Sequence, residues 1–382
     1  MKFDIDSDEY EEEYEEDFEG DYEEKPKKSS KSKKRQEIEQ KKLYLIIALL
    51  IVLALIIVFI TYVALKKGNP TQPAAPVTSP TTTKKEQKSI TVVNQNSNDR
   101  PIAVMIDNAI GDARHAGLQD SYLNYEIIVE GGLTRIMAIY KDADATLIGP
   151  IRSARHYFLD YALESDAIYA HYGWSPYAED DITKLAIDNI DGLTMPEAYR
   201  RDNNSIAPHN VFTKMKYLKS YLEKTNYEKT SSNWELLSYS ADPVDLNDTN
   251  YVPKQAIKVN IPYSTNEYRT YAYDPSNEYY LRSNNGKAQL DRITGNQLHY
   301  KNIIIQRVPN RTLDSEGRQE VETTGSGKGY YITNGFFLPI KWSKESRESK
   351  TYYTYDDGTE IMVNDGNTFI QIVPVDSNIT IE

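Results

Sequence analysis

The longest apolar run of the chain lies near its N-terminus. Residues 43–65 read LYLIIALLIVLALIIVFITYVAL and contain no charged side chain. A helix needs about 20 such residues to cross a hydrocarbon core of roughly 30 Å, so the run predicts one transmembrane helix. Tyr44 and Tyr62 stand near its two ends, where aromatic side chains meet lipid headgroups. Lys66 and Lys67 follow directly, with no small-residue cleavage site, so we expect an uncleaved anchor rather than a signal peptide.

Charged segments precede this run. Residues 1–24 hold fourteen acidic side chains and one lysine, which repel one another and cannot bury a core. Residues 25–42 hold nine basic side chains and two glutamates. The more basic flank of a membrane span stays in the cytoplasm. We therefore predict a disordered cytoplasmic tail over residues 1–42, a transmembrane helix over residues 43–65, and the remaining chain outside the cell membrane.

Two segments lack the apolar periodicity of a folded element. The acidic tail is either a solvated, solubilising segment or a docking site for a basic cytoplasmic partner, with its aromatic residues as anchors. Residues 66–89 are rich in proline and threonine, which predicts an extended linker between the membrane and the folded part.

From residue 90 the pattern alternates between strand-like and helix-like periods. Four short apolar runs predict strands over residues 101–107, 125–132, 134–142 and 167–173, the middle two joined as a hairpin around Gly131 and Gly132. Helical spacing predicts helices that begin at Pro150, at Pro176 with Ser175 as the N-cap, and at Thr213. This mixture predicts an α/β or α+β domain over residues 90–245.

From residue 246 strands dominate the pattern. Apolar and alternating runs are separated by the turn pairs Asp274-Pro275, Asn285-Gly286, Asn334-Gly335, Asp357-Gly358 and Asp365-Gly366. Such pairs between short strands are typical of antiparallel hairpins. The predicted fold is thus an α/β (or α+β) N-terminal ectodomain followed by a mainly antiparallel β domain over residues 246–382, behind a single N-terminal transmembrane helix.

Composition narrows the classes of function. A net charge of −13 over 382 residues disfavours nucleic acid as a partner. The absence of cysteine excludes a disulfide framework, a cysteine-based zinc site and a cysteine nucleophile, and five histidines make a histidine-rich metal site unexpected. The GSGKG run at residues 325–329 lacks the spacing of a phosphate loop. We expect no metal and no cofactor.

The run GPIRSAR at residues 149–155 carries the most informative charges. If a helix begins at Pro150, then Arg152, Ser153 and Arg155 lie in its first turn or just beyond. Positive side chains are unfavourable at this end of a helix unless an anion is near. That anion is either a carboxylate of the chain itself or the carboxylate or phosphate of a ligand, both of which arginine binds well.

Polar residues at strand ends are candidate partners. Asp107 and Asn108 close one predicted strand and are either site residues or caps of a turn. Glu126 and Glu130 are four apart on the next strand and so share a face, and Glu130 stands before the two glycines. Glu130 is a candidate general acid or base. The simpler interpretation is an ion pair with Arg135 or Arg152.

Two histidines are further candidates. His171 lies at the end of a predicted strand, where it is either a ligand-contacting group or a structural residue. His209 and Asn210 lie in a predicted loop, and loops on a rigid scaffold often carry function. His209 is therefore a second candidate acid or base. The sequence does not show whether these residues converge.

Several motifs together resemble one known family. They are PIAVMIDN (101–108), YEIIVEGGLTR (125–135), GPIRSAR (149–155), APHN (207–210), YYLRSNNGKAQLDRITG (279–295), VETTGSGKGYY (321–331) and NTFIQIVP (367–374). In this order they resemble the YerB-like family, extracytoplasmic proteins that carry the domain of unknown function 3048 and its C-terminal companion domain. The resemblance covers residues 95–375 and implies a two-domain, membrane-tethered envelope protein without implying a reaction. Typical members resemble lipoproteins anchored by a cysteine, and here the predicted helix takes that place.

These observations lead to two functional hypotheses. The first is a membrane-anchored extracytoplasmic binding or scaffold protein of the bacterial cell envelope, which recognises an anionic wall polymer or an envelope protein and regulates wall assembly. The second is an enzyme acting on wall polymers, with Glu130 or His209 as acid or base. A single trusted carboxylate is fewer than most glycosidases use, which favours the first hypothesis.

Overall fold

The computed structural model describes residues 88–109 and 115–382, which belong to one compact unit of the chain. The predicted cytoplasmic tail, the predicted transmembrane helix and nearly all of the predicted linker lie outside these residues. Within the part that the structure describes, no helix is both long and apolar enough to cross a bilayer.

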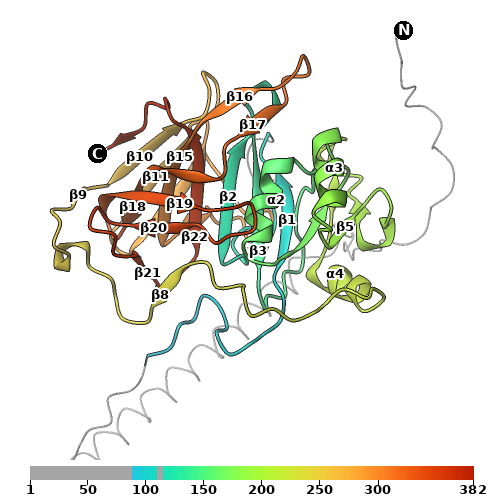
Figure 1. The fold of residues 1–382 in the computed structure, drawn as a ribbon, viewed down its shortest axis with the longest axis horizontal. Helices are drawn as coiled ribbons and strands as arrows, with labels where there is room; N and C mark the ends of the chain where they lie inside the picture. Colours follow the sequence, from blue (N-terminus) through green and yellow to red (C-terminus); the bar gives the residue numbers. More distant parts are fainter. Residues whose placement is uncertain (1–87, 110–114) are drawn as a thin grey trace, which may run out of the picture. The chain divides into compact units, whose positions relative to one another are not determined.

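Eleven strands form one mixed sheet. They are β1 (Ile102–Asp107), β2 (Leu123–Ile128), β3 (Thr134–Tyr140), β4 (Ile168–His171), β5 (Asn189–Asp191), β9 (Lys254–Gln255), β15 (Asn302–Val308), β18 (Gly325–Thr333), β19 (Phe336–Lys344), β20 (Tyr352–Thr354) and β22 (Thr368–Pro374). Their order is β20-β19-β18-β15-β22-β2-β3-β1-β4-β5, and β9 pairs with β19 (Figure 1). Every residue of β1, β2 and β3 is buried, so the centre of this sheet is covered on both faces.

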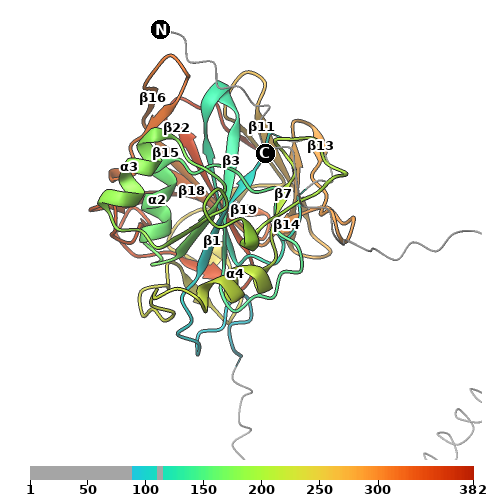
Figure 2. The same cartoon turned by 90° about the vertical axis from the view of Figure 1, so that its right-hand side faces the viewer.

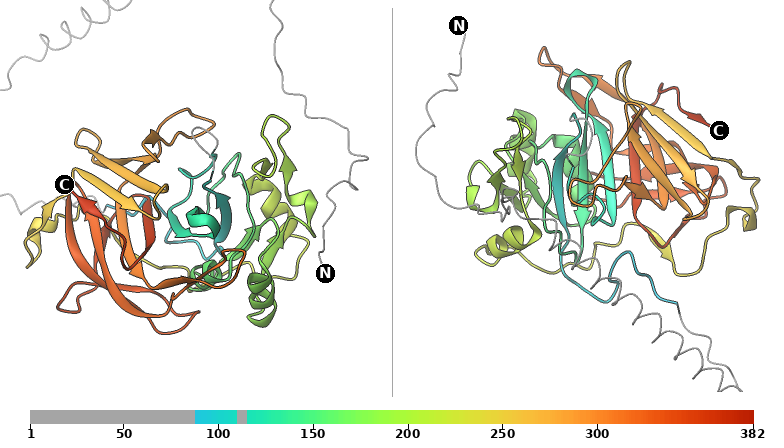
Figure 3. Two further views of the ribbon diagram at one scale, coloured as in Figure 1. Left: turned by 90° about the horizontal axis from the view of Figure 1, so that it is seen from above. Right: turned by 180° about the vertical axis from the view of Figure 1, so that it is seen from behind.

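A second sheet packs beside the strands of the C-terminal half (Figure 3). It consists of β10 (Lys258–Pro262), β11 (Tyr268–Asp274), β12 (Tyr279–Asn284), β13 (Lys287–Ala288), β14 (His299–Tyr300) and β23 (Thr380–Ile381). The rings of Tyr271 and Tyr300 lie against Phe369 of β22, with centroids 6.3 and 4.8 Å away. Aromatic contacts of this kind join the two sheets into one core.

The remaining elements are short. Three two-stranded sheets pair β16 (Asn310–Thr312) with β17 (Gln319–Val321), β8 (Ser238–Ser240) with β21 (Met362–Asn364), and β6 (Arg200–Arg201) with β7 (Val211–Phe212). Among the residues that the structure describes, the α-helices are α2 (His156–Leu163), α3 (Pro176–Lys184) and α4 (Met215–Leu222), and the 3-10 turns are η1 (Glu130–Gly132), η2 (Pro196–Ala198) and η3 (Leu246–Asp248). Helices α2 and α3 lie side by side, and α4 lies apart from them (Figures 1 and 2).

The fold is mostly β. Helices α2, α3 and α4 fall in residues 90–245, but strands outnumber them there. The hairpin around Gly131 and Gly132 is confirmed, because β2 and β3 pair antiparallel from Leu123↔Ile139 to Ile128↔Thr134. The turn at Asn334-Gly335 between β18 and β19 is also confirmed, and both residues have positive φ, 50° and 81°, as a two-residue hairpin turn requires.

The two segments predicted as separate domains contribute strands to the same sheet. Strand β22 from the C-terminal half lies between β15 and β2, and it pairs parallel with β2 from Leu123↔Thr368 to Ile127↔Ile372. Strands from before and after the predicted boundary at residues 245 and 246 therefore belong to one continuous sheet.

The prediction of a helix beginning at Pro150 is wrong. Helix α2 begins at His156, and Arg155 is its N-cap in an extended conformation (φ −130°, ψ 139°). The preceding residues run along the end of β1 instead, where the amide of Asp107 donates to the Pro150 carbonyl at 2.9 Å and the amide of Arg152 donates to the Met105 carbonyl at 3.0 Å. Pairing with a buried strand thus overrides the helical spacing of the apolar residues.

Candidate functional site

A cavity of about 340 Å³ lies at the ends of three central strands of the main sheet, where β1 and β2 end and β3 begins. The register pairs Asp107 at the end of β1 with Arg135 near the start of β3, and η1 follows β2 at the same edge. The hairpin of β16 and β17, near the top of Figure 1, brings Glu316 and Arg318 to the cavity from the C-terminal half. The charged residues that line it are Asp107, Glu130, Arg135, Arg152, Arg155, Glu316 and Arg318.

Glu130 and Arg155 form a bidentate ion pair in this cavity. Arg155 Nε donates to Glu130 Oε1 at 2.6 Å, and Arg155 Nη2 donates to Glu130 Oε2 at 2.8 Å. Burial alone raises the pKa of Glu130, but the hydrogen bonds and charge of Arg155 outweigh it and lower that pKa below its usual value. Glu130 is thus held in an ion pair, but by Arg155 rather than by Arg135 or Arg152, and it stays ionised at neutral pH.

Asp107 holds two groups that come from separate loops. Its Oδ2 lies 2.5 Å from His209 Nδ1 and 3.1 Å from Arg152 Nε. The contact with Arg152 is an ion pair without hydrogen-bond geometry, and the buried Nε–H of Arg152 has no hydrogen-bond partner among the residues described. Arg152 Nη1 donates to the Pro208 carbonyl at 3.2 Å, so Asp107 and the loop at Pro208 together hold this guanidinium.

Arg135 is the most deeply buried arginine that lines the cavity, with 6% of its surface exposed. It donates to the Ser153 carbonyl at 2.5 Å, a neutral partner. Burial, together with the charges of Arg155 and Arg152, lowers the pKa of Arg135 to about 10. Glu130, the carboxylate that counteracts this shift, is already held by Arg155. The guanidinium of Arg135 thus sits in a locally positive field that an anion would relieve.

Four predicted ligand-binding residues, His171, Asn210, Asn108 and Ser153, do not line the cavity. His171 is fully buried, with Nδ1 2.9 Å from the Gly173 carbonyl, and burial lowers its pKa despite nearby Asp191. Asn210 accepts a hydrogen bond from Arg201 at 3.1 Å. Asn108 belongs to a buried network below the cavity, and Ser153 contributes its carbonyl rather than its hydroxyl to Arg135.

That buried network is centred on Glu126, which does not share a site with Glu130. Glu126 Oε1 accepts from Arg269 Nε at 2.5 Å, and Glu126 Oε2 accepts from Arg282 Nη2 at 2.5 Å. The side chains of all three residues are completely buried. The sequence alone could not identify these partners, because Arg269 and Arg282 lie in the other half of the chain. The same holds for Arg318 and Glu316, whose place at the cavity depends on the hairpin of β16 and β17.

The charged lining of this cavity has the chemistry of an anion site. Within residues 88–109 and 115–382, no group of three or more histidine and carboxylate side chains could hold a metal ion. Four arginines and three carboxylates line the cavity. Guanidinium groups bind carboxylate and phosphate oxygens through paired N–H donors, and burial strengthens such contacts.

Comparisons with known proteins give consistent matches. Residues 89–228 match the "Protein of unknown function (DUF3048) N-terminal domain", and residues 259–370 match its C-terminal domain. The chain is 30% identical over 279 residues to YerB of Bacillus subtilis (strain 168), which is described as a candidate lipoprotein. This match covers 72% of this chain and 81% of YerB. The crystal structure of Bacillus subtilis YerB matches with a TM-score of 0.66 and 29% identity, over 74% of this chain and 94% of that one.

Proposed function

This chain belongs to the family of proteins that carry the DUF3048 N-terminal and C-terminal domains, and from that premise we propose that it is a membrane-anchored binding protein of the bacterial cell envelope. In this proposal the folded unit stands outside the membrane. Its cavity at the ends of β1, β2 and β3 holds the carboxylate or phosphate group of a wall polymer or of an envelope protein. By this binding the protein regulates wall assembly.

Two observations support the location. The relative YerB is described as a candidate lipoprotein, a class that is held to a membrane from outside by a lipid on a cysteine. This chain has no cysteine, but residues 43–65 have the length and apolar composition of a membrane-spanning helix. One anchor would then replace the other, with the folded unit on the same side.

The buried guanidinium of Arg135 is the observation that carries the binding proposal. Removing a charge from water costs several kcal/mol unless a counter-charge compensates it. Arg152 and Arg155 increase that cost, since each adds a like charge beside Arg135. An anionic group in the cavity offsets that cost.

The binding proposal is tested with the full-length chain and purified cell walls, prepared with and without their phosphate-rich polymers. Arg135→Gln removes the central charge, and we expect it to weaken retention about tenfold or more, in line with the loss of a charge-assisted hydrogen bond. Arg311→Gln is the matched control, because Arg311 is exposed on β16 and does not line the cavity. Equal retention of the two variants, at equal folding by circular dichroism, would contradict the proposal.

The location is tested separately. The intact chain should stay with membranes through an alkaline carbonate wash, and external protease on protoplasts should digest the folded unit while residues 1–42 stay protected. Recovery of the intact chain in the soluble fraction would rule out the anchor without affecting the cavity.

One contact favours a second candidate function. A carboxylate that holds an imidazole, as Asp107 holds His209 at 2.5 Å, is the usual arrangement of a general base. Glu130 suits acid catalysis less, because Arg155 keeps its pKa low. The enzyme alternative therefore rests on His209 acting on a wall polymer. Release of soluble wall fragments by the wild type and not by His209→Gln would support it, and no release by either would remove it.

A further inference from the structure

The arginines that line the cavity at the ends of β1, β2 and β3 differ in whether a carboxylate of the chain already neutralises them. Arg155 holds Glu130 through two hydrogen bonds, of 2.6 and 2.8 Å. Arg152 Nε lies 3.1 Å from Oδ2 of Asp107. Because each guanidinium faces a carboxylate at contact distance, neither of them adds an uncompensated charge to the lining.

The hairpin of β16 and β17 brings a third such pair to the cavity. Arg318 Nη1 donates to Asp314 Oδ2 at 2.8 Å, four residues back across the turn of the hairpin. Glu316, in the same turn, also lines the cavity, and its side chain is exposed. The hairpin therefore adds no net positive charge, and the carboxylate of Glu316 repels any excess of negative charge on a ligand.

Arg135 is the exception among these arginines. Within the described part of the chain it forms no ion pair, and its one hydrogen bond runs from Nη1 to the neutral carbonyl of Ser153. The residue is nonetheless buried and lines the cavity. Its Nε and Nη2, which share one edge of the guanidinium, are left as two parallel donors. Two oxygens of one anion fit such an edge, as the carboxylate of Glu130 fits that of Arg155.

The cavity thus offers one uncompensated positive charge to a ligand. We infer that it takes a group with a single negative charge, a phosphodiester or a carboxylate of a wall polymer, and discriminates against a doubly charged phosphate monoester. A second charge on the anion would meet arginines that are already paired, with Glu130, Asp107 and Glu316 beside them. Removing it from water would also cost more than removing a single charge. This inference rests on the proposed function, because it specifies the ligand of the same cavity.

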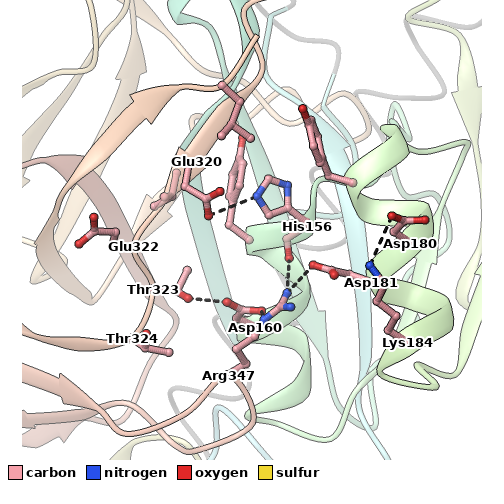
Figure 4. A pocket seen from close by; sticks show the side chains of 14 residues that line it. His156, Asp160, Asp180, Asp181, Lys184, Glu320, Glu322, Thr323, Thr324 and Arg347 are labelled. Atoms are coloured by element: carbon pink, nitrogen blue, oxygen red, sulfur yellow. Dashed lines mark hydrogen bonds and ion pairs between the residues drawn. The ribbon is translucent and has the colours of Figure 1, made fainter.

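A second cavity, of about 540 Å³, is unsuited to an anion (Figure 4). Five carboxylates line it against one lysine and one arginine. That arginine, Arg347, donates from Nε to Asp160 Oδ1 at 2.6 Å and from Nη2 to Asp181 Oδ2 at 2.8 Å, so it is already engaged. A lining with an excess of carboxylates repels anions. Binding of a small anion is therefore expected at Arg135 and not here.

The test uses the full-length chain in detergent micelles, with ¹⁵N-labelled arginine, and three phosphate esters that differ in charge. Trimethyl phosphate is neutral, dimethyl phosphate carries one charge, and methyl phosphate carries two at pH 8, because its second pKa is about 6. Titration of the Arg135 ¹⁵Nε resonance, identified by its absence in Arg135→Gln, gives each dissociation constant. At pH 8 we expect methyl phosphate to bind at least about fivefold more weakly than dimethyl phosphate, because of its second charge. Trimethyl phosphate should not bind.

Lowering the pH to 5 supplies an internal control. Methyl phosphate is then mostly singly charged, so its dissociation constant should come within about twofold of that of dimethyl phosphate. Dimethyl phosphate has the same charge at both pH values, so titration of His209, Asp107, Glu130 or Glu316 in the protein affects both probes and cancels in their ratio. Acetate at pH 8 distinguishes the two sources. Tighter binding of acetate than of dimethyl phosphate would assign the site to a carboxylate, and the reverse order to a phosphodiester.

Variants that unpair a second arginine should remove the selectivity. Glu130→Gln leaves Arg155 without its carboxylate, so we expect the affinity for methyl phosphate at pH 8 to rise about fivefold or more relative to that for dimethyl phosphate. Asp314→Asn releases Arg318 in the turn of the hairpin and keeps the test valid if Glu130→Gln folds poorly. Glu345→Gln is the matched control, because Glu345 is exposed and does not line the cavity, and it should leave the ratio unchanged.

Failure of this inference and failure of the proposed function give different results. If methyl phosphate binds as tightly as dimethyl phosphate at pH 8, the selectivity for a single charge is overturned and the anion site remains. The same conclusion follows if Glu130→Gln and Asp314→Asn change the ratio no more than Glu345→Gln does. If no anion shifts the Arg135 resonance of the wild type, the anion site itself is refuted, and the inference with it.

Discussion

At the scale of single residues, the structure buries charged side chains whose partners cannot be identified from the neighbouring sequence. Glu126 meets Arg269 and Arg282 in the core, and Arg269 also binds Glu267 at 2.9 Å, so two acids balance two bases. Burial alone raises the pKa of Glu126, but the charges of both arginines outweigh it and lower that pKa. The network is stable only as a complete set, because each member left alone would be an uncompensated buried charge.

Glu126→Gln tests this network. The substitution keeps the shape but leaves Arg269 and Arg282 with a single carboxylate, so we expect the free energy of unfolding to fall by about 3 to 5 kcal/mol. Urea unfolding followed by tryptophan fluorescence measures it. The control is Asp356→Asn, whose pair with Lys341 has side chains 69% and 56% exposed; we expect a change below about 1 kcal/mol there.

A buried histidine predicts how stability depends on pH. His115 Nε2 donates to the Asp107 carbonyl at 2.6 Å, and its Nδ1 then accepts from Gln289 at 3.1 Å. Burial lowers the pKa of His115 from 6.5 to about 4. Between these values the unfolded chain binds more protons than the folded one, so this histidine makes stability fall as the pH falls from 6.5 toward 4.

His115→Gln should therefore reduce the pH dependence of unfolding. The difference in unfolding free energy between pH 7 and pH 4.5 should shrink by about 2 to 3 kcal/mol, because the shift of pKa converts at about 1.4 kcal/mol per unit. Glutamine can still donate to the Asp107 carbonyl. An unchanged difference between the two pH values would show that His115 is protonated in the folded state.

At the scale of elements, helix and turn motifs in the sequence predicted the structure correctly where residues close in sequence also contact one another in the fold. Ser175 caps α3 as predicted, because its Oγ accepts from the amide of Ala178 at 3.3 Å and Pro176 takes the first helical position. The helix predicted from Pro150 failed because β1 competes for the same backbone groups. Arg152 consequently reaches the cavity from an extended segment rather than from a helix end.

Ser175→Ala tests the cap. The amide of Ala178 would lose its acceptor, so we expect the free energy of unfolding to fall by about 1 kcal/mol, as for other N-cap serines. Thermal unfolding of the full-length chain measures the change. Ser276→Ala, in the exposed turn after β11, serves as the control and should leave the midpoint unchanged.

At the scale of the whole molecule, the parallel pairing of β2 with β22 joins the two halves. The two family domains meet between residues 228 and 259, near the boundary predicted at residue 245. The strands on both sides nevertheless belong to one sheet, and the Glu126 network spans the same junction. Separating the halves would expose the edges of two fully paired strands and leave buried charges without partners.

We therefore expect the halves to fold together. Expressed alone, residues 88–245 and residues 246–382 should each lack a cooperative unfolding transition, whereas the full-length chain should show coincident transitions by circular dichroism and by tryptophan fluorescence. A cooperative transition of the isolated C-terminal half would contradict this expectation.

The sequence by itself determined the features that depend on residues a few positions apart. These are the apolar runs of β1 and β3, the cap at Ser175, the hairpin turn at Asn334-Gly335 and the family motifs. It also singled out Asp107, Glu130, Arg135, Arg152 and Arg155, which the fold brings to one cavity.

Only the tertiary structure decided which charges meet. Glu126 finds Arg269 and Arg282, which stand 143 and 156 residues further along the chain, and the hairpin of β16 and β17 adds Arg318 to a cavity formed by the other half. Strand geometry places a charge four residues from another only while the strand continues, and β2 ends at Ile128, so Glu130 lies in η1 and does not share the face of Glu126. A partner more than a hundred residues away depends on how the strands are ordered in the sheet, which periodicity does not specify.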